Sequence, residues 1–191
     1  PTEEGTYDIT GFVDIYYGQP KFHAIKFDAP YDIVKIGESK IATFCSEFPR
    51  DFKDTGVQAY IATKITTKEY ETSVTLEEVE KVPAGVGVIL MSATPGEYDV
   101  PSASSAIIEK TNYLIGTKKD TPIKSKDEET GNINYVLLRH NVTGDVAFHP
   151  LTSENDYTYT VSAGKAYLSI PQAVGATPKP NAPLKIVFDD E

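Results

Sequence analysis

The chain has 191 residues and a formal net charge of −10 at pH 7, from 18 basic and 28 acidic side chains. This length suits one large β domain or two small ones, with a core that folds without disulfides. The acidic balance, without any basic run, argues against nucleic acid or an anionic membrane as the main partner. Apolar runs are far shorter than the ~20 residues of a membrane helix, so we expect no membrane insertion by this chain. The single cysteine, Cys45, excludes an internal disulfide and a cysteine-based zinc cluster.

The composition predicts strands. Val, Ile, Thr, Tyr and Phe together make up 71 of the 191 residues, and these stiff side chains suit a pleated sheet better than a helix. Gly and Pro fall between the apolar runs, as expected for turns. No stretch keeps helical spacing over the length of a typical helix.

The first predicted element is a hairpin formed by residues 7–16 and 21–27, with residues 18–20 as its turn. Pro30 then marks the internal boundary that we predict. It separates an N-terminal hairpin at 1–33, interpreted as the tail of a preceding module, from a β-sandwich domain at 34–191.

Further strands are predicted along the rest of the chain. Residues 117–132 carry many charges and few apolar side chains, so we expect a mobile surface loop there. Residues 172–183, with three prolines, are expected to be an extended connector. About a dozen short strands predict an all-β fold, an antiparallel β-sandwich or a barrel-like relative of it. These further strands are predicted at 33–36, 41–45, 57–65, 73–82, 86–91, 97–100, 112–115, 133–140, 146–148, 157–161, 165–170 and 184–188.

Two segments share an order of elements that suggests an internal three-stranded repeat. Each runs strand, turn, strand, and then places Ala-Gly before an apolar strand, at Gly85 and at Gly164. If the repeat is real, residues 82–90 and 161–170 are equivalent strands. Coincidence is the alternative, because Ala-Gly is a common pair. Gly85 and Gly87 are interpreted as marking a bulge or a close crossing of backbones.

Motifs for catalysis are missing from the sequence, which has no nucleophile elbow, no zinc-protease motif and no phosphate-binding loop. His140 and His149 flank a predicted turn, where His140 faces about Asp145 and His149 faces about Val136, too far apart to share a metal ion. We therefore expect no catalytic residue, no cofactor and no metal ion. Calcium in the acidic loops and a hydrolase with two converging carboxylates stay open, because such sites form only in space.

Tyrosines are the remaining candidates for ligand contact. Tyr16 and Tyr17 flank the first hairpin turn, and Tyr157 and Tyr159 alternate with Thr on one strand face. An exposed Tyr stacks on a sugar ring while its hydroxyl stays hydrated. The alternative function is therefore an accessory carbohydrate-binding module with Tyr stacking platforms. Half-buried tyrosines at a sandwich edge are the other interpretation, and the absence of Trp weakens a glycan platform.

The order of several segments resembles a known family. The segments are KVPAGVGVIL at 81–90, GEYDVP at 96–101, AGKAYL at 163–168 and IVFDDE at 186–191. They are similar to a β-rich domain near the C-terminus of large secreted or surface-attached proteins of gut and oral Bacteroidetes, often described as adhesins, and the similarity covers residues 36–191. The resemblance implies an extracellular or outer-membrane location, with an export signal upstream of Pro1, and supplies no catalytic residues.

The sequence therefore predicts a non-catalytic secreted or cell-surface module that serves attachment or spacing. Its expected partner is a protein or a glycan at the cell surface.

Overall fold

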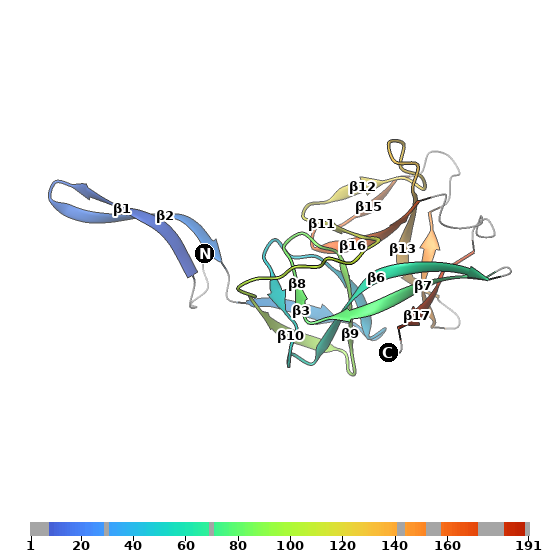
Figure 1. Ribbon diagram of the computed structural model, residues 1–191. Coiled ribbons are helices and arrows are strands. Elements are labelled where there is room, and N and C mark those ends of the chain that lie inside the picture. Colours follow the sequence, from blue (N-terminus) through green and yellow to red (C-terminus); the bar gives the residue numbers. More distant parts are fainter. Residues whose placement is uncertain are drawn as a thin grey trace.

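The computed structural model describes residues 8–28, 31–68, 71–140, 144–151, 158–171 and 182–189. These residues form seventeen strands and no helix, which confirms the predicted all-β fold (Figure 1). The strands are β1 (Asp8–Tyr16), β2 (Gln19–Asp28), β3 (Tyr31–Ile36), β4 (Ile41–Phe44), β5 (Arg50–Asp51), β6 (Val57–Lys68), β7 (Glu71–Val79), β8 (Lys81–Val82), β9 (Val88–Ser92), β10 (Gly96–Pro101), β11 (Leu114–Thr117), β12 (Thr121–Ile123), β13 (Ile133–Arg139), β14 (Val146–Pro150), β15 (Tyr159–Val161), β16 (Lys165–Ile170) and β17 (Lys185–Phe188).

A central sandwich is formed by a five-stranded sheet, in the order β17-β7-β6-β9-β4, and a four-stranded sheet, in the order β11-β16-β13-β14. Apolar side chains from both sheets meet between them, so the predicted sandwich is confirmed. Only β17 runs parallel to its described neighbour, β7. The central core consists of Ala62, Ile65, Val74, Leu76 and Ile89 from the first sheet, Leu114, Tyr135, Phe148, Leu168 and Ile170 from the second, and Leu184.

Both outer faces of the sandwich are covered as well. The antiparallel pair β3–β10 packs on the outer face of the five-stranded sheet, where Val34, Ile36 and Val100 meet side chains of β6 and β9. The pair β12–β15 packs on the outer face of the four-stranded sheet through Ile123 and Val161. The fold thus has three layers of buried apolar side chains between four layers of strands.

A β-bulge lets β6 contribute to two of these layers. Val57, Ala59 and Ile61 alternate onto the outer core, as period-two side chains do. The pairing with β7 shifts register between Ala62 and Lys64. Because the extra residue reverses the alternation, Ile65 faces the central core and not the outer one.

The internal repeat is present, and it is larger than predicted. The orders β4-β9-β6-β7 and β11-β16-β13-β14 match strand for strand, with every pair antiparallel. Each unit also contains a short antiparallel pair, β5–β8 in the first and β12–β15 in the second. Strands β9 and β16, which follow the two Ala-Gly turns, therefore occupy equivalent positions in a duplicated six-stranded unit.

The two Ala-Gly turns are built alike. Gly85 and Gly164 have φ of 79° and 75°, in the left-handed region that favours glycine. Gly85 N–H donates to the carbonyl of Ser46 at 2.8 Å, and Gly164 N–H donates to the carbonyl of Thr117 at 2.7 Å. The second turn is thereby tied to the last residue of β11, and the first turn to a residue just beyond the end of β4.

The backbones of the two units cross closely beside these turns. A Cβ on Gly87 would lie 2.8 Å from the Cβ of Ala166 and 2.8 Å from the backbone N of Gly116. A Cβ on Gly116 would lie 2.6 Å from the Sγ of Cys45. Gly87 and Ala166 each lie two residues after the glycine of an Ala-Gly turn, so equivalent positions meet at this junction. The predicted close crossing at Gly87 is confirmed, and Cys45 is buried, 4% exposed.

The last strand links the edges of the two sheets. Leu184 exchanges two backbone hydrogen bonds with Phe148 of β14, and the following residues pair with β7 as β17. The C-terminal segment therefore bridges the two units on one side of the sandwich.

The predicted N-terminal hairpin is confirmed as β1–β2. Its turn is formed by Tyr17 and Gly18, at φ of 50° and 73°, so that Tyr16 pairs with Gln19 and Pro20 lies within β2. Figure 1 shows the hairpin extending away from the sandwich. Strand β3, which belongs to the sandwich through its pairing with β10, begins at Tyr31 and so crosses the predicted boundary at 33.

Residues 117–132, predicted as a surface loop, contain a strand, so that part of the prediction was wrong. Strand β12 lies within this segment and pairs with β15, and Ile123 is 6% exposed. Pairing with β15 and burial of Ile123 in the small outer core together hold this short strand. The connector predicted at 172–183 falls mostly outside the described residues.

Candidate functional site

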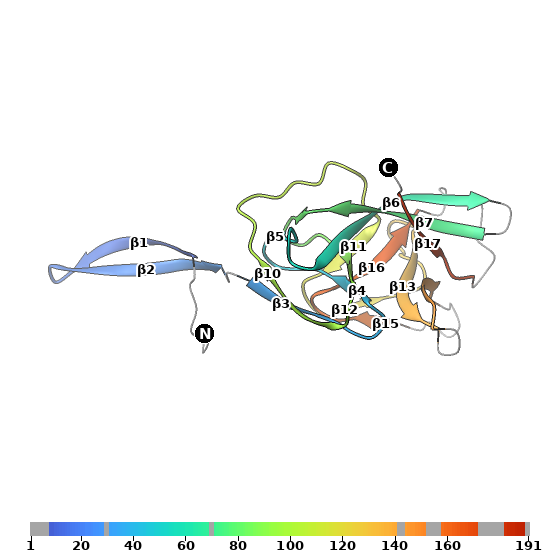
Figure 2. The same ribbon diagram turned by 90° about the horizontal axis from the view of Figure 1, so that it is seen from below.

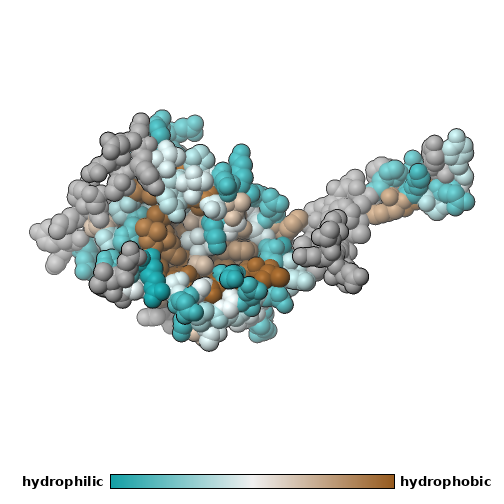
Figure 3. Space-filling view, turned by 180° about the vertical axis from the view of Figure 1, so that it is seen from behind, coloured by the Kyte–Doolittle hydropathy of each residue, from teal (hydrophilic) through white to brown (hydrophobic). Residues whose placement is uncertain are grey.

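One face of the β1–β2 hairpin is apolar and exposed. Val13 lies directly opposite Phe22, and Ile15 lies opposite Pro20. Opposite residues of an antiparallel pair share a face, so these four side chains form one apolar strip, here called the hairpin face. Val13, Ile15 and Phe22 are 64%, 72% and 55% exposed. Figure 3 shows brown, hydrophobic atoms along one side of the hairpin.

On the opposite side, the middle of the hairpin carries a charged pair. Asp14 faces Lys21 across the pair, and opposite charges in that position stabilise a sheet modestly. The Asp14 carboxylate also accepts a hydrogen bond from the backbone N–H of Ile15 at 2.7 Å. At Asp14 and Lys21, the hairpin therefore has a side suited to water opposite the apolar hairpin face.

Of the four predicted tyrosine contacts, only the side chains of Tyr17 and Tyr159 lie within the described part of the chain. Tyr17 is 89% exposed at the hairpin tip, whereas Tyr159 is half-buried on β15 and packs against the outer core below it. The side chain of Tyr16 and all of Tyr157 lie outside the described residues. A carbohydrate platform at these positions stays a prediction.

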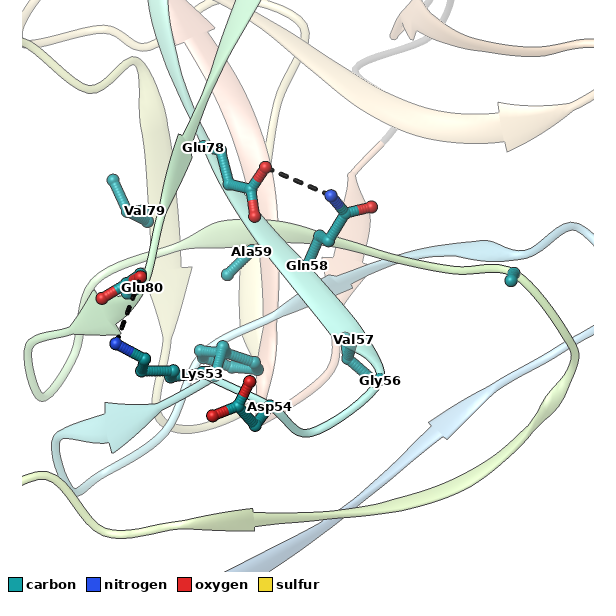
Figure 4. Close-up of a pocket in the computed structure, with 11 residues that line it drawn as sticks. Lys53, Asp54, Gly56, Val57, Gln58, Ala59, Glu78, Val79 and Glu80 are labelled. Atoms are coloured by element: carbon teal, nitrogen blue, oxygen red, sulfur yellow. Dashed lines mark hydrogen bonds and ion pairs between the residues drawn. The ribbon is translucent and has the colours of Figure 1, made fainter.

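A shallow groove of about 400 Å³ lies where β6 begins and β7 ends. Its floor includes Val57 and Ala59, and its rim is polar (Figure 4). Gln58 donates to Glu78 at 3.1 Å across β6 and β7, and Lys53 lies 4.0 Å from Glu80. The oxygens of this rim can accept hydrogen bonds from hydroxyl or ammonium groups of a ligand.

A second groove of about 580 Å³ lies between β7 and the segment 107–110. Ile108 is part of its wall, and Ile107 beside it is 81% exposed. Lys110 forms an ion pair with Glu77 that connects the segment to β7. This groove separates a loop from the sheet on which it rests.

Titratable groups with shifted pKa values are scattered and held by local structure. Burial raises the pKa of the Cys45 thiol. Hydrogen bonding with Thr94 lowers the pKa of Tyr98. The pKa of Asp127 is lowered because its carboxylate accepts hydrogen bonds from the backbone N–H and the hydroxyl of Thr130, both at 2.7 Å. These groups belong to the junction of the two units, to strand β10 and to the turn at residues 127–130.

The histidines that the sequence singled out lie where the register predicted. His149 pairs with Val136, and the backbone N–H of His140 donates to the carbonyl of Asp145. Within the described ranges, no group of three or more His, Cys, Asp or Glu side chains is placed to hold a metal ion. Calcium in the acidic loops stays open, because residues 153–156 and 190–191 lie outside those ranges.

A buried arginine, which the sequence gave no reason to select, has a structural role. Arg50 is 0% exposed, and its Nε lies 2.8 Å from Asp32 Oδ2. It also donates to the hydroxyls of Ser46 and Ser102, at 3.1 and 2.8 Å. Arg50 thereby joins β5, β3 and two loops under the outer layer. The sequence does not reveal this cluster, because Asp32 and Ser102 lie 18 and 52 residues away from Arg50.

Comparisons with protein-family models, with curated proteins and with solved structures find no match to this chain. The resemblance to the Bacteroidetes surface domain therefore stays a prediction. Among the described residues, no helix has the length and apolar character that crossing a membrane requires.

Proposed function

We propose that this chain is a non-catalytic module of a secreted or cell-surface protein, and that it serves attachment or spacing. The observation that supports this proposal is the combination of a sandwich filled in three apolar layers with a hairpin at one end whose apolar face is exposed (Figure 2). A body packed in this way holds its ends at a fixed separation, because close-packed interiors deform little. The hairpin face supplies an attachment element.

The duplicated unit supports the same role. The two units share two features, an Ala-Gly turn in each and a close crossing of their backbones, which hold the units together. The parts that depart from the duplication are the hairpin, β3–β10 and β17. These parts lie at the outside of the fold, where contacts to other structures form.

The test replaces residues 8–189, the hairpin included, by a short flexible Gly-Ser linker in the full-length surface protein on producing cells. We expect a shorter distance between an N-terminal epitope and the membrane, measured by fluorescence energy transfer, or reduced retention of the cells on protein-coated and glycan-coated surfaces. An unrelated β-sandwich of similar size in the same place is the matched control. It restores the distance if the module is a spacer, and fails to restore retention if the module itself attaches. Unchanged distance and retention in the linker variant would contradict the proposal.

A further inference from the structure

We infer that another β domain of the same polypeptide packs on the hairpin face and takes up β1–β2 into its own sheet. This inference rests on the proposed function and names the partner of its attachment element. Three observations carry it: the exposure of the hairpin face, its distance from the sandwich, and its area.

The hairpin face is exposed to an extent that an isolated hairpin does not sustain. Val13, Ile15 and Phe22 are each more than half exposed. In the described residues, β1 and β2 pair with one another only. A two-stranded hairpin is marginally stable in water, and becomes independently stable when further strands or a packed layer cover its apolar face. The face therefore requires a cover.

The sandwich of this chain is not positioned to supply that cover. Two residues separate the end of β2 at Asp28 from the start of β3 at Tyr31. Strand β3 is held along its whole length by pairing with β10, so the base of the hairpin is fixed at one end of the sandwich. Phe22 lies six residues before the end of β2, or about 20 Å further out along an extended strand. Figures 1 and 2 show the hairpin directed away from the sandwich.

A second copy of the chain is too weak a partner for this face. Nine residues of β1 at about 3.3 Å each, by two strands at about 4.8 Å each, give a strip of roughly 300 Å². Stable association of free proteins buries about 800 Å² on each partner. A partner within the same polypeptide needs far less area, because tethering raises its effective concentration to about the millimolar range.

The hairpin also offers a way to join the sheet of such a domain. The outer edges of β1 and β2 have no strand beside them in the described structure. Unpaired edges accept a further strand through main-chain hydrogen bonds. In this arrangement the apolar strip enters the core of the partner domain, while Asp14 and Lys21 stay in water on the other side.

The test compares amide hydrogen exchange in the 191-residue chain with that in the polypeptide of the complete reading frame. We expect the amides of β1 and β2 to exchange about a hundredfold more slowly in the longer polypeptide, because opening then requires unpacking a domain. The variant Phe22→Asp should remove this protection. Lys21→Ser changes the neighbouring residue, which lies on the other side of the hairpin opposite Asp14, and should retain the protection. Unchanged urea unfolding of the sandwich in both variants shows that the rest of the chain is folded.

Three results would overturn the inference. They are equal exchange of the hairpin in the two polypeptides, a reading frame without another β domain, and a dimer of the 191-residue chain in sedimentation that Phe22→Asp dissociates. The last result would identify a second copy as the cover. The proposed function can fail separately. If the hairpin amides are protected in the longer polypeptide but the linker variant keeps both its distance and its retention, the inference stands and the proposed function does not.

Discussion

The close crossing of the two units makes Gly87 the most sensitive test of the duplicated architecture. In Gly87→Ala, the new methyl group would lie 2.8 Å from the Cβ of Ala166, 2.8 Å from the N of Gly116 and 2.9 Å from the carbonyl C of Ile115. Two of these three atoms belong to the backbone of β11, which is fixed by its pairing with β16. The methyl group therefore cannot be accommodated by rotating a side chain.

The expected cost follows from these contacts. Overpacking a filled core typically destabilises by about 1–3 kcal/mol, and contacts with backbone place this site toward the upper end. Alanine also reduces the entropy of the unfolded chain, which offsets about 0.4–1 kcal/mol. The net loss in the free energy of unfolding is then about 2 kcal/mol. For a domain of this size that corresponds to a melting temperature lower by roughly 4–8 °C.

Urea unfolding with a constant m-value measures this loss. Gly37→Ala is the matched control, because a Cβ there meets nothing within 4 Å; it should leave stability unchanged or slightly raised. Adding Ala166→Gly to Gly87→Ala removes the contact between the two methyl groups and leaves the two backbone contacts, so we expect partial rescue. If Gly87→Ala were as stable as Gly37→Ala, the two units would not be in the close contact described.

Three further predictions concern single groups. In Asp32→Ala, the buried Arg50 loses its ion pair with Asp32, and breaking a buried pair costs about 3–5 kcal/mol. Because the Asp32 side chain is 33% exposed, we expect the free energy of unfolding in urea to fall by about 3 kcal/mol. An unchanged free energy of unfolding would contradict the role of Arg50 as a cross-link. Thr130→Ala removes the hydroxyl that donates to Asp127 and keeps the backbone N–H, so the pKa of Asp127 should rise part of the way toward its ordinary value of 3.8, as followed by carboxyl carbon NMR. The lowered pKa in the fold means that this carboxylate contributes stability above that ordinary value, which is lost as the pH falls through the folded pKa; an unmoved titration would refute the hydroxyl as one of its causes. Burial and a raised pKa should keep Cys45 unreactive toward a thiol reagent at pH 8 until urea unfolds the chain, whereas rapid labelling of the folded chain would show that the junction opens.

Most strands were predictable from the sequence because each carries its own apolar side chains. β13 has three consecutive buried residues and β16 has four buried residues among its six, and both were predicted close to their observed bounds. β12 was not predictable, since Ile123 is its single buried residue. Its strand state depends on pairing with β15, a contact between segments far apart in the sequence.

The repeat was predictable where the backbone demanded a particular residue. Both Ala-Gly turns need a positive φ, so Gly85 and Gly164 stand out in the sequence. The equivalence of β4 with β11 and of β5 with β12 carried no such mark. At the crossing itself, Gly87 is matched by Ala166, because one methyl group fits between the backbones and two do not.

The hairpin face illustrates what sequence alone omits. Its alternating pattern, with Val13 and Ile15 on one strand and Phe22 on the other, predicts a strand pair with one buried side. The pattern does not say what buries it. Figure 1 shows that the hairpin extends away from the sandwich. This geometry, together with the register that sets Val13 opposite Phe22, identifies the hairpin as a candidate site. The tyrosines selected by residue type alone include Tyr159, which packs against a core.

A duplicated fold separates the residues that maintain the architecture from those that distinguish this protein. The strands of the two units face each other and bury their side chains in shared layers, so substitutions there are constrained in pairs, as Gly87 and Ala166 are. The hairpin, β3–β10 and β17 have no counterpart in the other unit among the described strands, and the duplicated core would exist without the hairpin. An element with an exposed apolar face that the core does not need, and that is placed where the core cannot cover it, must be explained by a contact outside the core. That is why we assign the contact with a partner to the hairpin and not to the grooves, whose side chains already bind one another across β6, β7 and the 107–110 segment.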